Sequence, residues 1–155
     1  MTDKDKTQMG RSLPKCEFDS KKLILHLNLA IPANIKHIDP VVEKIMWVVD
    51  QMRCAVGKEF EIETALRESL ANAIVHGCKG DPDKEIQFAV ACDEEKGMMI
   101  VVRDPGKGFD PETLPSPIQG ECLYSEHGRG IFLINQLMDE VEFDRGGTEI
   151  RMRKS

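Results

Sequence analysis

Three polar side chains in the segment ESLANAIVHG, residues 68 to 77, are spaced so that they could do chemistry together. Glu68, Asn72 and His76 follow one another at intervals of four residues. On a helix with about 100° per residue they fall within an arc of roughly 80°, beside an apolar stripe. The amide oxygen of Asn72 is a suitable ligand for a hard cation such as Mg²⁺, which is usually coordinated by substrate phosphates as well. Glu68, one turn earlier, is placed to accept a proton from an attacking hydroxyl group.

A solvated helix edge is the competing interpretation of these three residues, because each of them alone is ordinary on the surface of a helix. His76 fits either interpretation. The choice between them depends on what the rest of the chain can supply.

A second segment, DPGKGFD, begins at Asp104 directly after an expected strand. Its Pro-Gly and aspartate content alone predicts a turn. Gly106 and Gly108 would also let a planar ligand approach the backbone, and the carboxylate of Asp104 could accept a hydrogen bond from an exocyclic amine such as that of adenine.

Two further glycine-rich segments follow. The first is Gly128-Arg129-Gly130, which precedes an apolar run and is expected to open a helix. The free N–H groups at the start of that helix could bind phosphate, with added positive charge from Arg129. The alternative is that the segment is an ordinary glycine-rich helix cap. Neither a Walker A loop nor a Rossmann fingerprint is present. Gly146-Gly147-Thr148 predicts a hairpin turn, after which Thr148 would start a strand and could face a ligand.

Apolar periodicity predicts the elements that must position these segments. Strands are expected at residues 22–29, 85–92, 98–103, 141–144 and 148–152. Helices are expected from Asp39, as N-cap, to Gly57, from about Glu61 to Gly77 as the C′ residue, and from Gly130 to Met138. The order predicts an α+β two-layer sandwich, a mixed and mostly antiparallel sheet covered on one face by helices.

Composition narrows the class of protein. The chain has 155 residues, 41% of them apolar, and a net charge of -6. The length and apolar content predict a single domain over 14–155. Residues 1–13 are charged and lack periodicity, which predicts a flexible tail. The absence of a basic cluster argues against nucleic-acid binding, and the absence of a long apolar run or a secretory signal makes a cytoplasmic location the expectation. The five scattered cysteines are expected to be reduced, packed thiols.

In order and content the four segments resemble the N, G1, G2 and G3 boxes of the histidine-kinase-like (GHKL) ATPase superfamily. The runs ESLANAIVHG, DPGKGFD, HGRGIFLI and GGTEIRM look most like those of the bacterial anti-sigma factor serine/threonine protein kinases. The resemblance covers the chain from about Cys16 to Lys154. It implies the histidine-kinase-like ATPase fold and a kinase that uses ATP and Mg²⁺.

The resemblance also implies a role for each residue. Glu68 would be the catalytic base, Asn72 would ligate Mg²⁺, and Asp104 would read the adenine amino group. The other implied nucleotide-binding residues are Gly106, Gly108, Gly128, Arg129, Gly130 and Thr148. Residues 111–127 would form the ATP lid.

The implied partners are a sigma factor, sequestered by binding, and an anti-anti-sigma protein phosphorylated on Ser/Thr. A homodimer is also compatible, with residues 23–29 or the first helix as an apolar surface. Two alternatives are a stand-alone histidine-kinase-type ATPase domain and a non-catalytic nucleotide-binding interaction module. A histidine kinase would normally carry a phosphoacceptor histidine on a dimerisation helix, whereas His26 and His37 fall in an expected strand and loop.

Overall fold

The structure is a computed structural model, and it describes residues 23–106 and 126–155. In this part of the chain a five-stranded sheet has the order β1-β2-β3-β5-β4. The strands are β1 (Leu23–Pro32), β2 (Glu85–Asp93), β3 (Gly97–Arg103), β4 (Glu140–Asp144) and β5 (Glu149–Lys154). Each neighbouring pair is antiparallel, so the sheet shows none of the parallel pairing that a mixed sheet would have.

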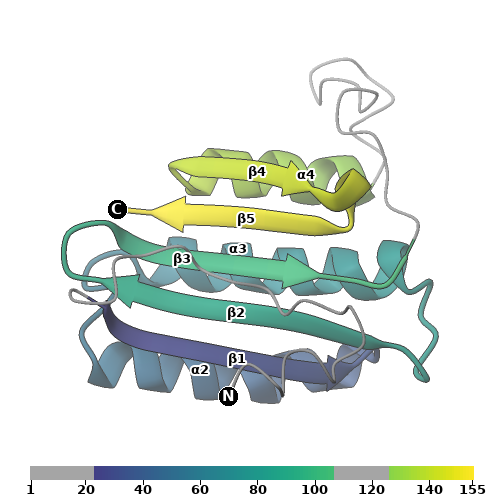
Figure 1. The fold of residues 1–155 in the computed structure, drawn as a ribbon, viewed down its shortest axis with the longest axis horizontal. Coiled ribbons are helices and arrows are strands. Elements are labelled where there is room, and N and C mark those ends of the chain that lie inside the picture. The colour runs from purple at the N-terminus through teal and green to yellow at the C-terminus, as the bar shows by residue number, and fades with distance from the viewer. Residues whose placement is uncertain (1–22, 107–125) are drawn as a thin grey trace, which may run out of the picture.

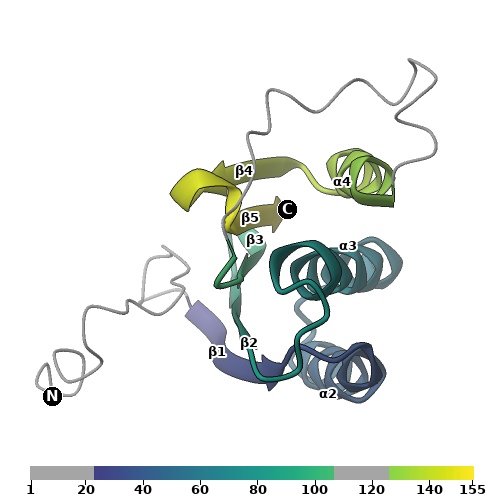
Figure 2. The same ribbon diagram turned by 90° about the vertical axis from the view of Figure 1, so that its right-hand side faces the viewer.

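The helices lie on one face of the sheet, which confirms the expected α+β two-layer sandwich (Figures 1 and 2). They are α2 (Ile38–Gln51), α3 (Glu59–Asn72) and α4 (Glu126–Leu137). Three short turns complete the described elements: η1 (Ile35–His37) precedes α2, η2 (Ala73–Gly77) follows α3, and η5 (Arg145–Gly147) lies between β4 and β5. No helix in the described ranges is long and apolar enough to span a membrane.

The core lies between the sheet and the helices that cover it, and includes buried residues of α2, α3 and α4. Strand register pairs Phe88 with Val102, which places both side chains on the helix-covered face. Both are buried, as are Leu66 and Leu70 on α3. Each such side chain contributes about 1.5–3 kcal/mol when it is fully buried. This packing holds α3 rigidly over the end of β3.

Helix α2 begins differently from the prediction. Asp39 lies inside its first turn rather than at the N-cap, which is His37 and makes no side-chain capping bond. The carboxylate of Asp39 instead forms an ion pair with Arg67 on α3. The local cap belongs to the preceding turn η1, where the Asn34 side chain accepts from the Lys36 N–H at 3.1 Å. A tertiary partner therefore replaces the expected local one.

The end of α2 is also earlier than the apolar stripe predicts. The chain leaves the helix with Arg53 in the left-handed region, at φ 57°. The N–H of Arg53 donates to the carbonyl of Asp50 and that of Cys54 donates to Val49, the paired bonds of a Schellman motif. Val56, expected on the buried stripe, is 62% exposed.

The cysteines within the described ranges carry free thiols, as expected from their scattered positions: Cys54, Cys78 and Cys92. Burial raises the pKa of Cys78 to about 11 and that of Cys92 to about 12. Both thiols therefore stay protonated at neutral pH. The tail expected over residues 1–13, and Cys16 and Cys122, lie outside the described residues.

Candidate functional site

A cavity of about 220 Å³ opens where α3, η2, α4 and the ends of β3 and β5 meet. Residues of all four motif segments line it, although they are far apart in the sequence. The lining residues are Ser69, Asn72, Ala73, His76, Gly77, Val102, Asp104, Ile131, Phe143, Gly147, Thr148 and Ile150. Its walls are thus partly apolar, with a few polar groups that converge on it, which is the usual composition of a small-molecule site.

Asp104 is anchored at the end of β3 from two directions. Its backbone N–H donates to the carbonyl of Thr148 at 2.9 Å. Its carboxylate Oδ1 accepts from the N–H of Gly106 at 2.7 Å, and Oδ2 has no hydrogen-bond donor among the described residues. Burial raises the pKa of Asp104, and this outweighs the lowering effects of the Gly106 N–H and the charge of Lys84.

Two glycines make room for this carboxylate. A Cβ atom at Gly77 would lie 2.2 Å from Cγ of Asp104, and one at Gly106 would lie 2.2 Å from the carbonyl oxygen of Gly77. The interpretation of Gly77 as a C′ residue is wrong, because Gly77 is not among the glycines with positive φ. Glycine is required there by the close approach of Asp104.

A π-helical turn brings Gly77 to this position. In η2 the N–H of Cys78 donates to the carbonyl of Ala73, five residues earlier, at 2.9 Å. Single π turns inside α-helices occur frequently at functional sites. His76 lies in this turn and lines the cavity.

A neighbouring groove between α3 and α4, of about 340 Å³, contains the Glu68 side chain. We call it the α3–α4 groove; it is lined by Glu68, Ala71, Asn72, Val75, His76, Gly130 and Leu133. Asn72 and His76 line both the groove and the cavity. Figure 2 shows α3 and α4 packed side by side over the same face of the sheet.

Gly130 lies in the groove close to Glu68 and Asn72. A Cβ atom there would be 3.1 Å from Nδ2 of Asn72 and 3.4 Å from Oε2 of Glu68. The backbone of α4 therefore passes directly over the carboxylate and the amide. Glu68 and Asn72, four residues apart on α3, both face Gly130 of α4. Because glycine has no side chain, α4 can approach them closely.

The comparison with known families decides what this arrangement is. Residues 31–154 match the model of the histidine kinase-like ATPase domain. The chain belongs to this family. Curated relatives include an anti-sigma F factor of Bacillus cytotoxicus, 28% identical over 131 residues, which are 81% of this chain and 80% of the relative. The serine-protein kinase RsbW of Bacillus subtilis is 24% identical over 136 residues, with 83% and 84% covered. The RsbW kinase of Staphylococcus aureus strain JH9 is 28% identical over 138 residues, with 83% and 85% covered.

Within the histidine kinase-like ATPase domain, the third motif segment occupies a position that differs from the prediction. Helix α4 begins at Glu126, so Gly128 and Arg129 lie in its first turn and Gly130 follows them inside the helix. A glycine costs only about 1 kcal/mol in a helix, which the burial of Ile131 and Ile134 outweighs. Gly108 and the side chain of Arg129 lie outside the described part of the structure.

Thr148 does not begin a strand. It caps the turn η5 and donates its hydroxyl hydrogen to the carbonyl of Arg145 at 2.8 Å, while β5 starts at the next residue. It nevertheless lines the cavity, opposite the α3 side that carries Asn72. The hydroxyl oxygen, which donates in this bond, can still accept a hydrogen bond.

The donor set of the site is compatible with a nucleotide bound together with a hard cation. No group of three or more His, Cys, Asp or Glu side chains that could hold a metal ion occurs in the described ranges. A cation here would have the oxygen of Asn72 as its protein ligand, with phosphates and water completing the shell. Mg²⁺ is bound in this way at many phosphoryl-transfer sites.

Local sequence patterns missed several lining residues. Ser69, Ile131 and Ile150 lie within the motif runs but had no role assigned to them, and Phe143 lies outside these runs. Only their place in the fold brings them to the cavity. Three of them are apolar and provide flat walls suited to a planar base. Their spacing within each strand or helix indicates burial but not what they are buried against.

Proposed function

We propose that the protein is an ATP-dependent protein serine/threonine kinase of the anti-sigma type. It would bind a sigma factor and phosphorylate an anti-anti-sigma partner, so that the partner's phosphorylation state decides which protein is bound. The observation that carries this proposal is the contact of Glu68 and Asn72 with Gly130, beside a cavity that contains Asp104. The names of the relatives, anti-sigma F factor and serine-protein kinase, support the same assignment.

The adenine end of ATP is assigned to Asp104 and Thr148. Oδ2 of Asp104 would accept from the adenine amino group, while Oδ1 is held by the Gly106 N–H. Val102 and Ile150 line the same cavity and provide apolar contacts for the ring faces. With these contacts, the protein would distinguish nucleotides by their base rather than by their sugar or phosphates.

The phosphate end is assigned to Asn72 and to the first turns of α4. The amide oxygen of Asn72 would hold Mg²⁺, which neutralises charge that develops on the transferring phosphate. Gly128, Arg129 and Gly130 would border the phosphates, where the N-terminal end of a helix favours negative charge. Phosphoryl transfer of this kind depends mainly on positioning, so few reacting side chains are needed.

Glu68 is assigned as the base that accepts the proton of the acceptor hydroxyl group. The α3–α4 groove offers the acceptor a route to it, because Glu68 and Asn72 line that groove together. The groove walls at Ala71, Val75 and Leu133 are apolar. An acceptor Ser or Thr flanked by small or apolar residues fits these walls better than one flanked by acidic residues, which the carboxylate of Glu68 would repel.

Substitution of Glu68 by Gln tests the proposal. Loss of the base should lower transfer of label from γ-labelled ATP to the protein partner by a factor of about 100 or more, with ATP affinity unchanged. Glu61→Gln, on the same helix but outside both cavities, is the matched control and should transfer label normally. The partner is obtained by affinity capture from a lysate of the source organism with Mg-ATP, followed by phosphosite mapping.

The two alternatives give different results in this experiment. A non-catalytic module would retain a partner without labelling it, in the wild-type protein as in the variant. A histidine-kinase-type ATPase domain would place label on histidine, which is lost in acid, rather than on serine or threonine. A phosphoserine or phosphothreonine on a captured small protein, together with a captured sigma factor, supports the proposed function. A homodimer, with residues 23–29 or helix α2 as its apolar surface, and a cytoplasmic location are further parts of the proposal.

A further inference from the structure

Glu149 is an acidic residue in an unusual position. It is 1% exposed, in the sheet and directly after Thr148. Its Oε1 accepts from Nε of Arg103 at 2.8 Å and from Nη2 of the same residue at 2.5 Å. Its Oε2 accepts from Nε of Arg151 at 3.0 Å. The carboxylate is therefore held by two guanidinium groups.

Stability alone does not account for this arrangement. Taking a carboxylate and a guanidinium out of water costs several kcal/mol per ion, and apolar residues of similar volume often stabilise a protein equally well. A buried ion pair is better known for selecting one arrangement of the elements that carry it than for stabilising the fold. The location of the pair indicates which geometry that is.

The pair joins β3 and β5 at their cavity ends. Arg103 and Glu149 are direct partners in the strand register, and they are the last residue of β3 and the first residue of β5. One residue beyond this pair, after the end of β3 and before the start of β5, the N–H of Asp104 donates a hydrogen bond to the carbonyl of Thr148 at 2.9 Å. Side chains alternate between faces along a strand, so Val102 and Ile150 face the cavity while Arg103 and Glu149 face the opposite side.

We propose that Glu149, through its ion pair with Arg103, is a positioning residue that sets the nucleotide-base selectivity of the cavity. The inference rests on the proposed function, since it assumes that Asp104 reads a base. Glu149 touches no nucleotide. It fixes how closely β3 and β5 meet, and so it fixes Asp104 and Thr148, which continue these strands into the cavity wall.

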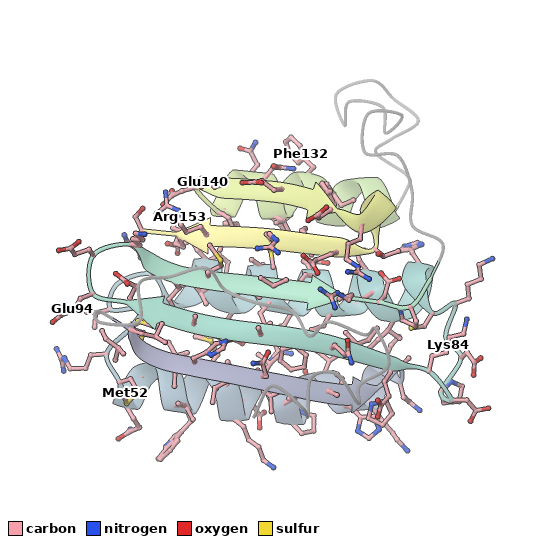
Figure 3. The ribbon with its side chains drawn as sticks, in the orientation of Figure 1. Met52, Lys84, Glu94, Phe132, Glu140 and Arg153 are labelled. Atoms are coloured by element: carbon pink, nitrogen blue, oxygen red, sulfur yellow. The ribbon has the colours of Figure 1, made fainter. Side chains whose placement is uncertain are left out.

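A second Glu–Arg pair in the same sheet serves as the control. Glu140 and Arg153 are register partners on β4 and β5 and also form an ion pair. In Figure 3 they lie together at the end of β5 away from the cavity, while the arrowhead of β3 points to the opposite end. Glu140 lines no part of the cavity, and its side chain is 56% exposed.

The test compares Glu149→Gln and Arg103→Lys with Glu140→Gln. Each protein is titrated with ATP and with GTP by calorimetry, and its thermal unfolding is recorded. We expect the ratio of ATP to GTP affinity to fall at least fivefold in the first two variants and to stay within twofold of wild type in Glu140→Gln. Because the folded fraction enters both affinities equally, loss of stability alone cannot change the ratio.

An unchanged ratio in both Glu149→Gln and Arg103→Lys would overturn the inference, whatever their stability. Should Glu149→Gln not fold, Arg103→Lys still decides, because it keeps the positive charge and removes the two-pronged contact. Failure of the wild-type protein to prefer ATP over GTP is a different result, and it would contradict the proposed function itself.

Discussion

The α-carbon of Gly77 lies directly against the carboxylate of Asp104. A methyl group at position 77 would come within 2.2 Å of Cγ and 2.5 Å of both carboxylate oxygens. The two residues are separated in the sequence by a turn and two strands. Their contact joins the π-helical end of α3 to the end of β3 and shapes the base-binding side of the cavity.

Gly77→Ala should therefore abolish adenine binding. The methyl group must displace the Asp104 side chain, at a cost of about 1–3 kcal/mol in the free energy of unfolding. Gly80→Ala is the control: Gly80 has φ +71° with nothing within 4 Å of a Cβ atom, so this variant loses stability through backbone strain alone, by a similar amount. Calorimetry with ATP should show binding in Gly80→Ala and none in Gly77→Ala. Equal ATP affinity in the two variants would contradict the role assigned to this contact.

Asp104→Asn should weaken the preference for adenine over guanine. The amide oxygen would keep the bond from the Gly106 N–H, so the NH₂ group would take the place of Oδ2 and meet the adenine amine donor to donor. We expect ATP affinity to fall about tenfold to a hundredfold while GTP, which offers a carbonyl oxygen, loses less. Asp81→Asn is matched, since Asp81 accepts from the N–H two residues later in the same way, and its ATP affinity should stay normal.

The pH dependence of adenosine binding should follow the raised pKa of Asp104. Adenosine is the suitable probe because it has no phosphates to titrate. As the pH falls from neutral toward 3.8, the ordinary pKa of an aspartate, the carboxylate of Asp104 gains its proton earlier than such an aspartate would, because burial raises its pKa, and the acceptor is lost. Affinity should decline over this range in the wild type and stay flat in Asp104→Asn, as measured by calorimetry.

The same shift predicts a change in stability of defined sign. Burial favours the protonated carboxyl group in the folded state, so the charged form destabilises the fold above the raised pKa and this effect disappears as the pH falls toward 3.8. Any gain in unfolding free energy from Asp104→Asn should therefore be largest at neutral pH. A gain that grows toward acid pH would mean that the pKa is lowered instead.

Gly130→Ala should separate phosphate binding from base binding. The new methyl group would press on the Asn72 amide, at 3.1 Å from Nδ2 and 3.3 Å from Oδ1, and would be in ordinary contact with Oε2 of Glu68 at 3.4 Å. Alanine is the better helix former by about 1 kcal/mol, so α4 should not lose stability. We expect adenosine affinity to stay unchanged while Mg-ATP affinity and phosphate transfer fall at least tenfold. Loss of adenosine binding as well would show that the whole cavity had collapsed.

The strands illustrate what local pattern can determine. The prediction for residues 85–92 and 98–103 agrees with β2 and β3 to within one residue, because alternation of apolar side chains is a property of the segment itself. The end of α2 shows the limit. Val56 continues the helical apolar stripe in sequence, yet the paired bonds at Arg53 and Cys54 end the helix before it.

For the site, the sequence by itself determined which residue types are available, in which order, and that Glu68 and Asn72 share one edge of a helix. Only the tertiary structure decided that Gly77 makes room for Asp104, that Gly130 lies over Asn72, and that Glu149 is buried against Arg103. The physical reason is that close approach and ion pairing depend on residues distant in the chain. A glycine or a glutamate has the same local appearance whether or not such a partner is present.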